Sequence, residues 1–289
     1  MTTIRHPAYT VRTPTGWRSV GQISGITGGA PDPDWAEEFD TLDMTTSSHV
    51  GRWRPNDFWQ NVNAGYEDFA GTSWNANPND GIGINPFSIA DSVLTITCQR
   101  TPPETVAAIE AEMVSQGVGG TAPAWTGGIL ITNDAVRRFL YGYFEWRVRF
   151  PQVGRGMFPA LWLYHASGED TKPDAEIDVF EIFGSAAGSP VVASYHQAGN
   201  GDSISTSSPD VTGWHRYGLD WQPSYLRLYV DDEMVGELTG AAAEWFDVPM
   251  QVRLNYSMDA PWFPTKSNGT TPDPLTMEVD YIRHWAVKP

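Results

Sequence analysis

Short runs of β-branched and aromatic residues alternate with Gly- and Pro-rich stretches along most of the chain. In the run 144–150, apolar residues occupy every second position and the charged residues Glu145, Arg147 and Arg149 fall between them. This period of two is typical of a β-strand with one buried face. Comparable runs predict strands at 93–98, 128–132, 141–150, 161–164, 176–183, 191–196, 226–230, 252–256 and 277–285. Many short strands between turn signals indicate an all-β sandwich.

One segment departs from the strand pattern. A Pro-Pro pair precedes residues 104–116, in which Val106, Ile109 and Met113 recur at helical spacing, and glycines follow from residue 117. These features predict a single short helix in a loop between strands.

The first 33 residues differ in composition from the rest of the chain. They are rich in Thr, Gly and Pro and show weak periodicity, so we expect residues 1–33 to form an N-terminal extension. We expect residues 34–289 to form one domain, because all-β sandwiches of this length commonly fold as a single unit.

The charge balance narrows the classes of partner. The 35 acidic and 18 basic residues give a net charge of −17, which argues against nucleic-acid binding. No apolar stretch is long enough to span a membrane, and no signal peptide is evident at the start of this chain. The single cysteine, Cys98, lies in an apolar strand-like run, which favours a buried structural thiol over a nucleophile.

The segment 174–183 carries the most informative chemistry. Its acidic residues Glu176, Asp178 and Glu181 interrupt an otherwise apolar strand. Burying a carboxylate is costly unless it is paired or hydrogen bonded, so such a cluster indicates a functional site. The alternative is an edge strand with acids that face water.

The spacing of these acids makes a structural prediction. Glu176 and Asp178 share a face of a regular strand, whereas Glu181, five residues after Glu176, points to the opposite face. All three converge only if a β-bulge inserts one extra residue between Asp178 and Glu181. Two carboxyl groups roughly 5 Å apart are what a retaining glycoside hydrolase requires.

The motif Glu176-x-Asp178-x-x-Glu181 resembles the E-x-D-x-x-E signature of family 16 glycoside hydrolases, in its bulged laminarinase-like form. Flanking blocks resemble the family in the same order. They are Glu-Glu-Phe-Asp at 37–40, Tyr-Gly-Tyr-Phe-Glu-Trp-Arg at 141–147, Gly-Met-Phe-Pro-Ala-Leu-Trp-Leu at 156–163, the block that begins Trp-His-Arg-Tyr at 214, and Val-Asp-Tyr-Ile-Arg at 279–283. The resemblance covers about residues 34–287.

The resemblance implies a fold and a set of roles. The fold would be a β-jelly-roll sandwich, similar to concanavalin A, with a concave substrate cleft. Glu176 would be the nucleophile, Glu181 the acid/base, and Asp178 the orienting carboxylate between them. Catalysis would need no cofactor. A structural calcium ion is also implied, with Asp280 as a ligand.

Aromatic residues are candidates for sugar contacts, because sugar rings stack on aromatic faces. Trp162 and Tyr164 are two apart on one predicted strand and share a face. Trp125 and Trp262 are expected on loops, where an exposed Trp suggests a binding role. His196 matches a family position near the acid/base. For Trp162 and Tyr164, core packing is the alternative, and for His196 it is a side chain that is merely satisfied by its neighbours.

The expected activity is retaining endo-hydrolysis of a β-1,3- or β-1,3/1,4-glucan by a monomer outside the cell or at its surface. The residues leave a bacterial exopolysaccharide or a marine galactan open as substrate, because Ile129 and Phe158 depart from the laminarinase-like pattern. A non-catalytic glycan-binding protein and a transglycosylase remain alternatives. Fold alone does not separate them from a hydrolase.

Overall fold

The computed structural model of the chain describes residues 9–13, 16–20, 32–55, 73–117, 120–165, 172, 175–182, 191–197, 200–207, 210–260 and 265–289. Strands dominate these residues, so the predicted all-β class is confirmed. The strands of the large sheet are β3 (Trp35–Glu37), β4 (Trp53–Arg54), β5 (Trp74–Asn75), β6 (Phe87–Ala90), β7 (Val93–Arg100), β8 (Trp125–Thr132), β9 (Gly142–Arg149), β10 (Met157–His165), β11 (Glu176–Ile182), β12 (Val191–Gln197), β13 (Asn200–Ser207), β14 (His215–Gln222), β15 (Tyr225–Val230), β16 (Glu233–Thr239), β17 (Met250–Met258) and β18 (Leu275–Trp285).

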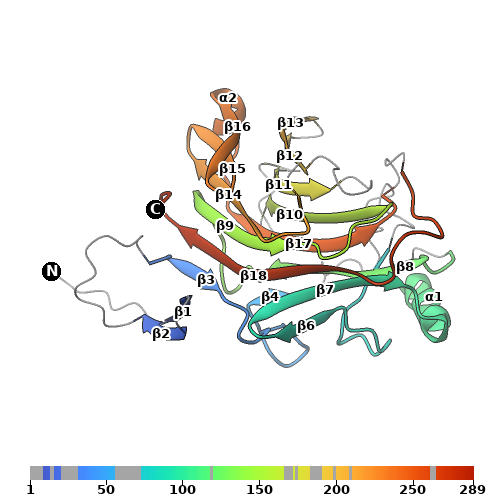
Figure 1. Cartoon of the computed structure of the whole chain (residues 1–289). Coiled ribbons are helices and arrows are strands. Elements are labelled where there is room, and N and C mark those ends of the chain that lie inside the picture. The colour runs from blue at the N-terminus through green and yellow to red at the C-terminus, as the bar shows by residue number, and fades with distance from the viewer. Residues whose placement is uncertain are drawn as a thin grey trace.

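The strands form two layers of a sandwich (Figure 1). One layer has the order β13-β12-β11-β10-β17-β8, the other has the order β7-β18-β9-β14-β15-β16, and pairing of β7 with β8 joins them. Their apolar faces meet in one core. The Phe180 ring of the first layer stacks on Phe150 at 5.1 Å and meets Tyr217 of the second layer edge-on at 4.5 Å.

Every predicted strand run coincides with an observed strand, but several strands were not predicted. The strands β13, β14 and β16 are rich in polar residues and lack a continuous apolar run. Cross-strand pairing with β12, β9 and β15 places them in the sheet, and this pairing is not visible in local sequence.

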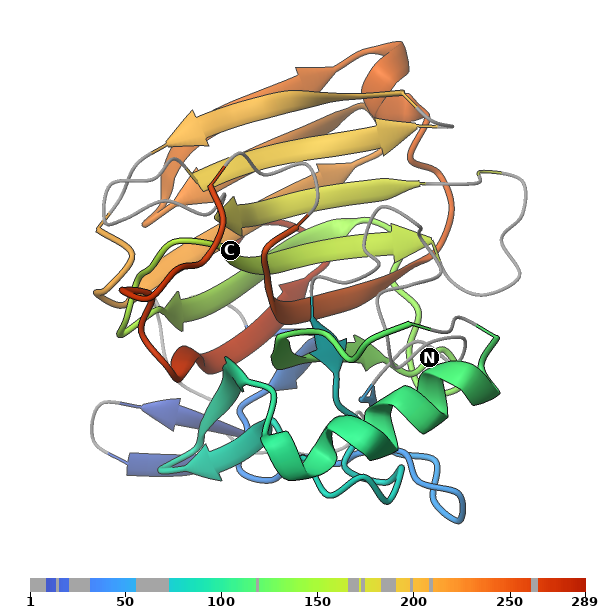
Figure 2. The ribbon, with the colours of Figure 1, turned by 90° about the vertical axis from the view of Figure 1, so that its right-hand side faces the viewer.

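The predicted helix is present as a 3₁₀ turn, Pro103–Thr105, followed by α1 (Val106–Ser115). It covers one end of the sandwich (Figure 2), where Ile109 and Met113 pack with Trp74 into a small second core. One further helical turn, α2 (Ala241–Glu244), was not predicted.

The N-terminal region contributes a separate hairpin. Strands β1 (Tyr9–Thr13) and β2 (Gly16–Val20) pair with each other, and in the described part of the chain they pair with no strand of the large sheet. The boundary between the extension and the domain stays a prediction.

Cys98 is fully buried on β7, as predicted. Burial raises the pKa of its thiol well above the usual range, so the thiol is not an activated nucleophile. In the described residues, no helix combines the length and apolarity that a membrane span requires.

Candidate active site

The predicted β-bulge is present on β11. On β10, Leu161 pairs with Phe180 and Trp162 pairs with Asp178, so Val179 is the extra residue. The pairing of β11 with β12 shifts at the same place, between Asp178 and Glu181. The bulge therefore absorbs the odd spacing of the acids and returns Glu181 to the face of Glu176 and Asp178.

Burial along β11 confirms this division into two faces. The apolar residues Ile177, Val179, Phe180 and Ile182 all belong to the sandwich core. Glu176 and Glu181 are only partly buried and lie on the opposite side of the strand. The apolar side chains thus anchor the strand, and the carboxyl groups remain accessible.

We use the name carboxylate face for the side of β12, β11, β10, β17 and β8 that bears these acids. Its residues lie in three cross-strand rows. Each row runs from β12 through β11 and β10 to β17, and the last two rows continue to β8. The rows are His196–Glu176–Tyr164–Gln251, Ser194–Asp178–Trp162–Arg253–Ile131, and Val192–Glu181–Ala160–Asn255–Ile129. Residues paired directly across strands share a face, so the structure brings Trp162, Tyr164 and His196 beside the catalytic candidates.

Hydrogen bonds connect the carboxyl groups. Ser194 Oγ lies 2.8 Å from Asp178 Oδ2 and 3.1 Å from Glu181 Oε2. The side chain of Glu176 hydrogen bonds Asp178 as well. His196 Nε2 is 3.4 Å from Asp178 Oδ2, although the His196 side chain is 48% exposed. Asp178, which is 2% exposed, is therefore the hub of the cluster.

The environment shifts the proton equilibria of both glutamates. Burial, followed by the negative charges of Asp178 and Glu181, raises the pKa of Glu176 well above its usual range, and Arg253 opposes this shift. Burial and the charge of Asp178 raise the pKa of Glu181, and the hydrogen bond from Ser194 opposes this shift. The clustered acids thus hold a proton more tightly than isolated carboxyl groups do, as an acid/base carboxyl requires.

A cation and two aromatic rings lie next to the acids. The Arg253 guanidinium is 4.9 Å from the Trp162 ring centroid and 4.6 Å from that of Tyr164. Arg253 also donates to Gln251 Oε1 at 2.9 Å, and Trp162 Nε1 donates to Asn255 Oδ1 at 2.8 Å. The two rings are thereby held in fixed orientations on the carboxylate face. Their predicted role in sugar binding stays a prediction.

The polar row on β17 was missed from the sequence. Gln251, Arg253, Asn255 and Ser257 alternate with apolar residues, and all four are buried. The alternation itself was the available signal, because a period of two with polar residues on one face marks a two-faced strand. Asn255 also supplies a polar group directly across from Ile129, one of the two positions that depart from the laminarinase-like pattern.

Trp125 and Trp262 were predicted to be sugar platforms. Trp125 is fully buried at the start of β8, where its Nε1 donates to Ser267 Oγ at 3.1 Å and the Arg100 guanidinium lies 4.2 Å from its ring centroid. A ring without an exposed face cannot stack on a sugar, so this prediction is wrong for the described conformation. Trp262 lies outside the described residues.

Asp280, the predicted calcium ligand, lies on the outer side of the second layer. Its Oδ2 accepts a charge-assisted hydrogen bond from Arg147 Nη1. Within the described residues, the group Glu176, Asp178 and His196 is the only close cluster of three acidic or His side chains, and Asp280 is not part of it. Asp178 in that group is already bound by Ser194, so we assign the group to the carboxylate cluster. Calcium binding at Asp280 stays a prediction.

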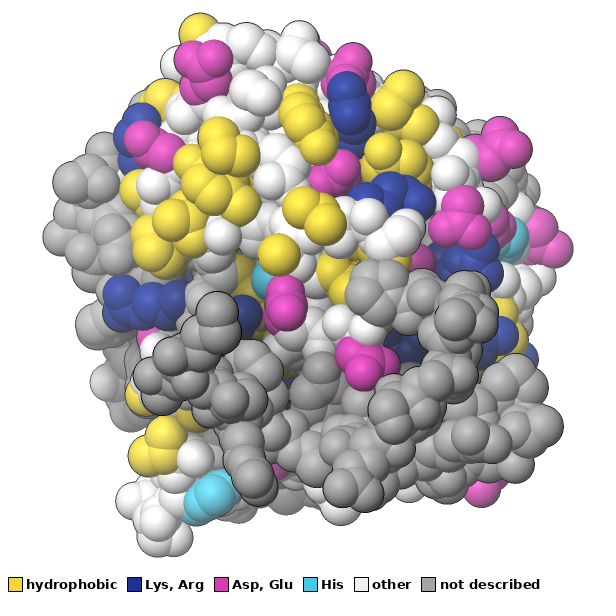
Figure 3. All heavy atoms as spheres, turned by 90° about the vertical axis from the view of Figure 1, so that its left-hand side faces the viewer, with side chains coloured by type: hydrophobic (Ala, Val, Ile, Leu, Met, Phe, Trp, Pro, Cys, Tyr) yellow, Lys and Arg dark blue, Asp and Glu magenta, His cyan; other side chains and the backbone are white. Residues whose placement is uncertain are grey.

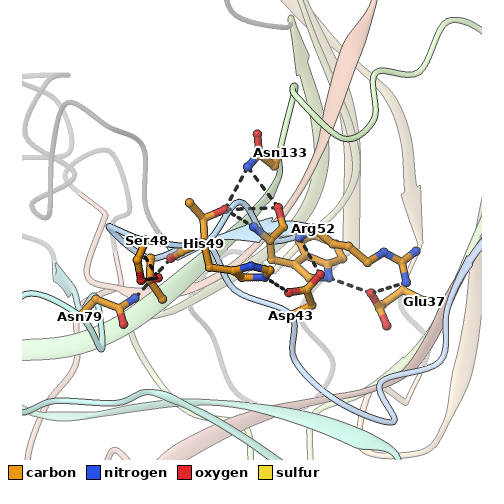
Figure 4. Close-up of polar contacts among 11 residues, drawn as sticks. Glu37, Asp43, Ser48, His49, Arg52, Asn79 and Asn133 are labelled. Carbon is orange, nitrogen blue, oxygen red and sulfur yellow. Dashed lines mark hydrogen bonds and ion pairs between the residues drawn. The ribbon is translucent and has the colours of Figure 1, made fainter.

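Glu37, from the family-like block 37–40, belongs to a different polar cluster (Figure 4). Glu37 Oε2 accepts from Trp53 Nε1 at 2.9 Å and lies 3.2 Å from Arg52 Nη1. Asp43 accepts from His49 at 2.6 Å, and Asn133 Nδ2 donates to the Gly51 carbonyl at 3.1 Å. The cluster ties the loop before β4 to β3 and to the end of β8.

A cavity of about 600 Å³ adjoins this second cluster and is lined in part by Glu37, Asp43 and Arg52. None of its lining residues lies on the carboxylate face. Glu37 is satisfied by hydrogen bonds, and burial raises its pKa. The cluster thus has a structural explanation, and the cleft predicted over the carboxylate face stays a prediction.

An antiparallel β-sandwich that presents neighbouring carboxyl groups on one face has the apparatus of a glycoside hydrolase. The family model of glycosyl hydrolases family 16 matches residues 92–283, and the chain belongs to this family. The predicted family and jelly-roll class are therefore confirmed.

The individual relatives share less than a third of the aligned residues with this chain. The chain is 29% identical over 264 residues to endo-1,3-1,4-beta-glycanase EglC of Rhizobium meliloti, covering 88% of this chain and 51% of that protein. It is 28% identical over 221 residues to a beta-glucanase of Rhodothermus marinus, covering 69% of this chain and 70% of the relative. The chain thus spans about half the length of EglC.

Among solved structures, the catalytic domain of an endo-1,3-beta-glucanase from Thermotoga petrophila superposes with a TM-score of 0.64 at 21% identity. The match covers 88% of this chain and 96% of that domain. At this identity the likeness supports the fold.

Proposed function

We propose that the protein is a retaining endo-β-glycanase that hydrolyses internal bonds of a β-1,3- or β-1,3/1,4-glucan. The observation that carries the proposal is the Val179 bulge, which brings Glu176, Asp178 and Glu181 into one hydrogen-bonded cluster. Each outer glutamate contacts the central aspartate directly or through Ser194. Such proximity suits a nucleophile and an acid/base better than the wider spacing that an inverting enzyme needs for its water.

The reaction follows from this arrangement. The Glu176 carboxylate, whose ionised form Arg253 favours against the effects of burial and of its acidic neighbours, attacks the anomeric carbon, and the bond from that carbon to the leaving oxygen breaks. The electron pair stays on the oxygen, which takes the proton of Glu181. Water then attacks the glycosyl-enzyme, gives its proton to Glu181 and releases Glu176. Asp178 holds both glutamates and keeps a negative charge beside the developing positive charge on the sugar.

The choice of substrate rests on charge and on the relatives. Three acids face the cation Arg253 and the partly exposed His196, so the face favours neutral sugars over sulfated ones. The relatives described above are named as glucanases or mixed-linkage glycanases. A bacterial exopolysaccharide or a marine galactan would be an alternative substrate, and binding without cleavage an alternative function.

The test compares Glu176→Gln with the wild type on soluble β-1,3- and mixed-linkage glucans, by the release of reducing ends. We expect a loss of more than about 10⁴-fold in kcat, because the covalent intermediate cannot form. Glu278→Gln is the matched control, because Glu278 pairs with Arg149 on the outer side of the sandwich. Equal activity of wild type and Glu176→Gln would contradict the assignment, and long oligosaccharide products without net new reducing ends would indicate transglycosylation.

We also propose the setting in which the protein acts. A polysaccharide substrate is met outside the cell or at its surface, so we expect the protein to act there. Each chain carries its own carboxylate face, so a monomer suffices for catalysis. None of the proposed steps requires a cofactor. Size-exclusion chromatography with light scattering and fractionation of the producing cells test the monomer and the location.

A further inference from the structure

Arg253 lies in the middle row of the carboxylate face, the row of Asp178, but its charged end is directed to the row of Glu176. Its Nη2 donates to Gln251 Oε1 at 2.9 Å, and its guanidinium carbon lies 4.6 Å from the Tyr164 ring centroid. Gln251 and Tyr164 both belong to the row of Glu176, and Tyr164 is the direct cross-strand neighbour of Glu176. These contacts bring a positive charge toward Glu176.

The corresponding positions in the row of Glu181 are neutral. On β10 this row continues with Ala160, and on β17 it continues with Asn255. Asn255 Oδ1 accepts from Trp162 Nε1 at 2.8 Å, so the amide is engaged with a ring of the middle row. The two glutamates of the cluster therefore have different neighbours on β17, and Arg253 acts on them unequally.

Burial gives the charge of Arg253 its reach, since the residue is 5% exposed. A charge that water and salt do not screen acts over a longer distance than a charge at the surface. Burial and the neighbouring acids raise the pKa of Glu176, and Arg253 lowers it. The pKa of Glu181 is shifted instead by burial, by Asp178 and by Ser194.

Carboxyl groups in contact share their protons, and the local potential decides which group holds a shared proton. We propose that Arg253 is a positioning residue that divides the roles of the two glutamates: its buried charge directs the proton of the cluster to Glu181 and leaves Glu176 ionised as the nucleophile. The role rests on the proposed function, in which Glu176 attacks and Glu181 donates the proton. Ser194 donates to Glu181 and acts in the opposite direction, so the charge of Arg253 outweighs one hydrogen bond.

The sign of the effect follows from the charge. Loss of a nearby positive charge disfavours an ionised carboxylate, so an uncharged residue at position 253 raises the pKa of Glu176 further and that of Glu181 less. The other titratable or charged groups that face Glu176 among the described residues are Asp178 and Glu181 on β11, Tyr164 on β10 and His196 on β12. Variants of Arg253 keep all four, so they are common to every titration.

The direct test is an NMR titration of the carboxyl groups in the free protein labelled with ¹³C-glutamate. Each signal is assigned by its absence in Glu176→Gln or Glu181→Gln. In the wild type we expect Glu176 to titrate at lower pH than Glu181. Arg253→Met has a side chain of similar length without the charge. In this variant we expect the Glu176 midpoint to rise by about one pH unit and the Glu181 midpoint to rise by less than half as much.

Arg253→Lys keeps the charge, so the Glu176 midpoint stays near its wild-type value. Arg149→Gln is the matched control, because it removes an arginine charge that pairs with Glu278 on the outer side of the sandwich, and both midpoints stay unchanged. Arg253→Gln replaces Arg253→Met if the latter does not fold, with the same expected shift. An unmoved or lowered Glu176 midpoint in the uncharged variants, an equal rise of both midpoints, or an equal shift in Arg253→Lys overturns the proposal.

Kinetics give a second readout. On a dinitrophenyl β-glycoside, whose leaving group needs no acid, the acidic limb of kcat/KM reports the ionisation of the nucleophile in the free enzyme. We expect this limb to move up by about one pH unit in Arg253→Met and to stay in place in Arg253→Lys, a pattern that a merely structural role does not produce. A wild type that is inert on every glycan contradicts the proposed function, whereas the NMR titration of the free protein still decides the role of Arg253.

Discussion

The two sides of the sandwich use carboxyl groups in opposite ways. On the outer side of the second layer, each of three acids on or beside β18 faces an arginine: Glu38 with Arg283, Glu278 with Arg149, and Asp280 with Arg147. Figure 3 shows one face of the molecule, where acidic and basic side chains lie next to each other. On the carboxylate face the acids instead lie beside one another.

The difference has an energetic meaning. A carboxylate paired with arginine is stabilised in its charged form, so the pair stabilises the folded state or leaves its stability unchanged. Clustered carboxylates repel each other and lose hydration, which raises their pKa and destabilises the folded state when they ionise. A fold keeps such a cluster where the perturbed proton equilibria have a use, as in acid/base catalysis.

The largest effect that separates the two sides concerns activity. Glu181→Gln removes the acid/base, and we expect a loss of about 10²–10⁴-fold in kcat/KM on glucan. Glu38→Gln makes the same chemical change in a paired acid, and the activity per folded molecule is expected to equal that of the wild type. Initial rates of reducing-end release measure both, and a comparable loss in Glu38→Gln would remove the distinction.

The next effect concerns stability, and here we expect the larger loss from the paired acid Glu38 and not from the clustered acid Glu181. Both carboxylate oxygens of Glu38 accept from Arg283, at 2.8 and 2.9 Å. Glu38→Gln leaves the largely buried guanidinium without its counter-charge, so we expect a loss of about 3 kcal/mol in the free energy of unfolding at pH 7. Denaturant titration measures this loss, and a change below about 1 kcal/mol would mean that the pair behaves as an exposed salt bridge.

The clustered acids predict a pH dependence of stability. The pKa of Glu181 is raised in the folded state, so its contribution to stability is fully present below the unfolded pKa of about 4.3 and is lost as the pH rises through the folded value. Glu181→Gln is neutral at all pH values and escapes this loss. Its melting temperature relative to the wild type should therefore be higher at pH 8 than at pH 4, by calorimetry. A difference that is constant with pH contradicts the raised pKa.

A smaller effect is expected from the aromatic residues of the carboxylate face. Tyr164→Ala removes a ring that lies beside Glu176 in the strand register, and we expect KM for glucan to rise about tenfold with a smaller change in kcat. Tyr225→Ala is the control, because Tyr225 lies on β15 of the other layer. An unchanged KM would place the sugar away from β10.

The smallest effect is expected at Asp280. Asp280→Asn weakens a partly exposed pair with Arg147, so the stability loss should stay below about 1 kcal/mol. The described contacts also predict that calcium and a chelator leave the melting temperature unchanged in both proteins. A calcium-dependent rise in the wild type that Asp280→Asn abolishes would establish the calcium site that the family resemblance implies.

The sequence predicted the carboxylates and the bulge because an odd spacing of acids in an apolar strand conflicts with a period of two. Ser194 could not be found in this way, because a single polar residue in a strand is compatible with either face and only the register of β12 against β11 brings it to the acids. The alternation on β17 marks Arg253 as part of a polar face, but only the register of β17 against β10 shows that the acids share this face. Trp125 was misassigned because its Pro- and Gly-rich surroundings suggested a loop, whereas it begins a fully buried strand.

The most direct measurement of the central claim is the stereochemistry of azide rescue with an activated aryl β-glycoside. In Glu176→Ala, azide takes the place of the missing nucleophile, so the account predicts an α-glycosyl azide. In Glu181→Ala, azide instead attacks the glycosyl-enzyme formed by Glu176, so it predicts a β-glycosyl azide. NMR of the products distinguishes the two anomers. The same anomer from both variants, or rescue of neither, would contradict the division of roles between Glu176 and Glu181.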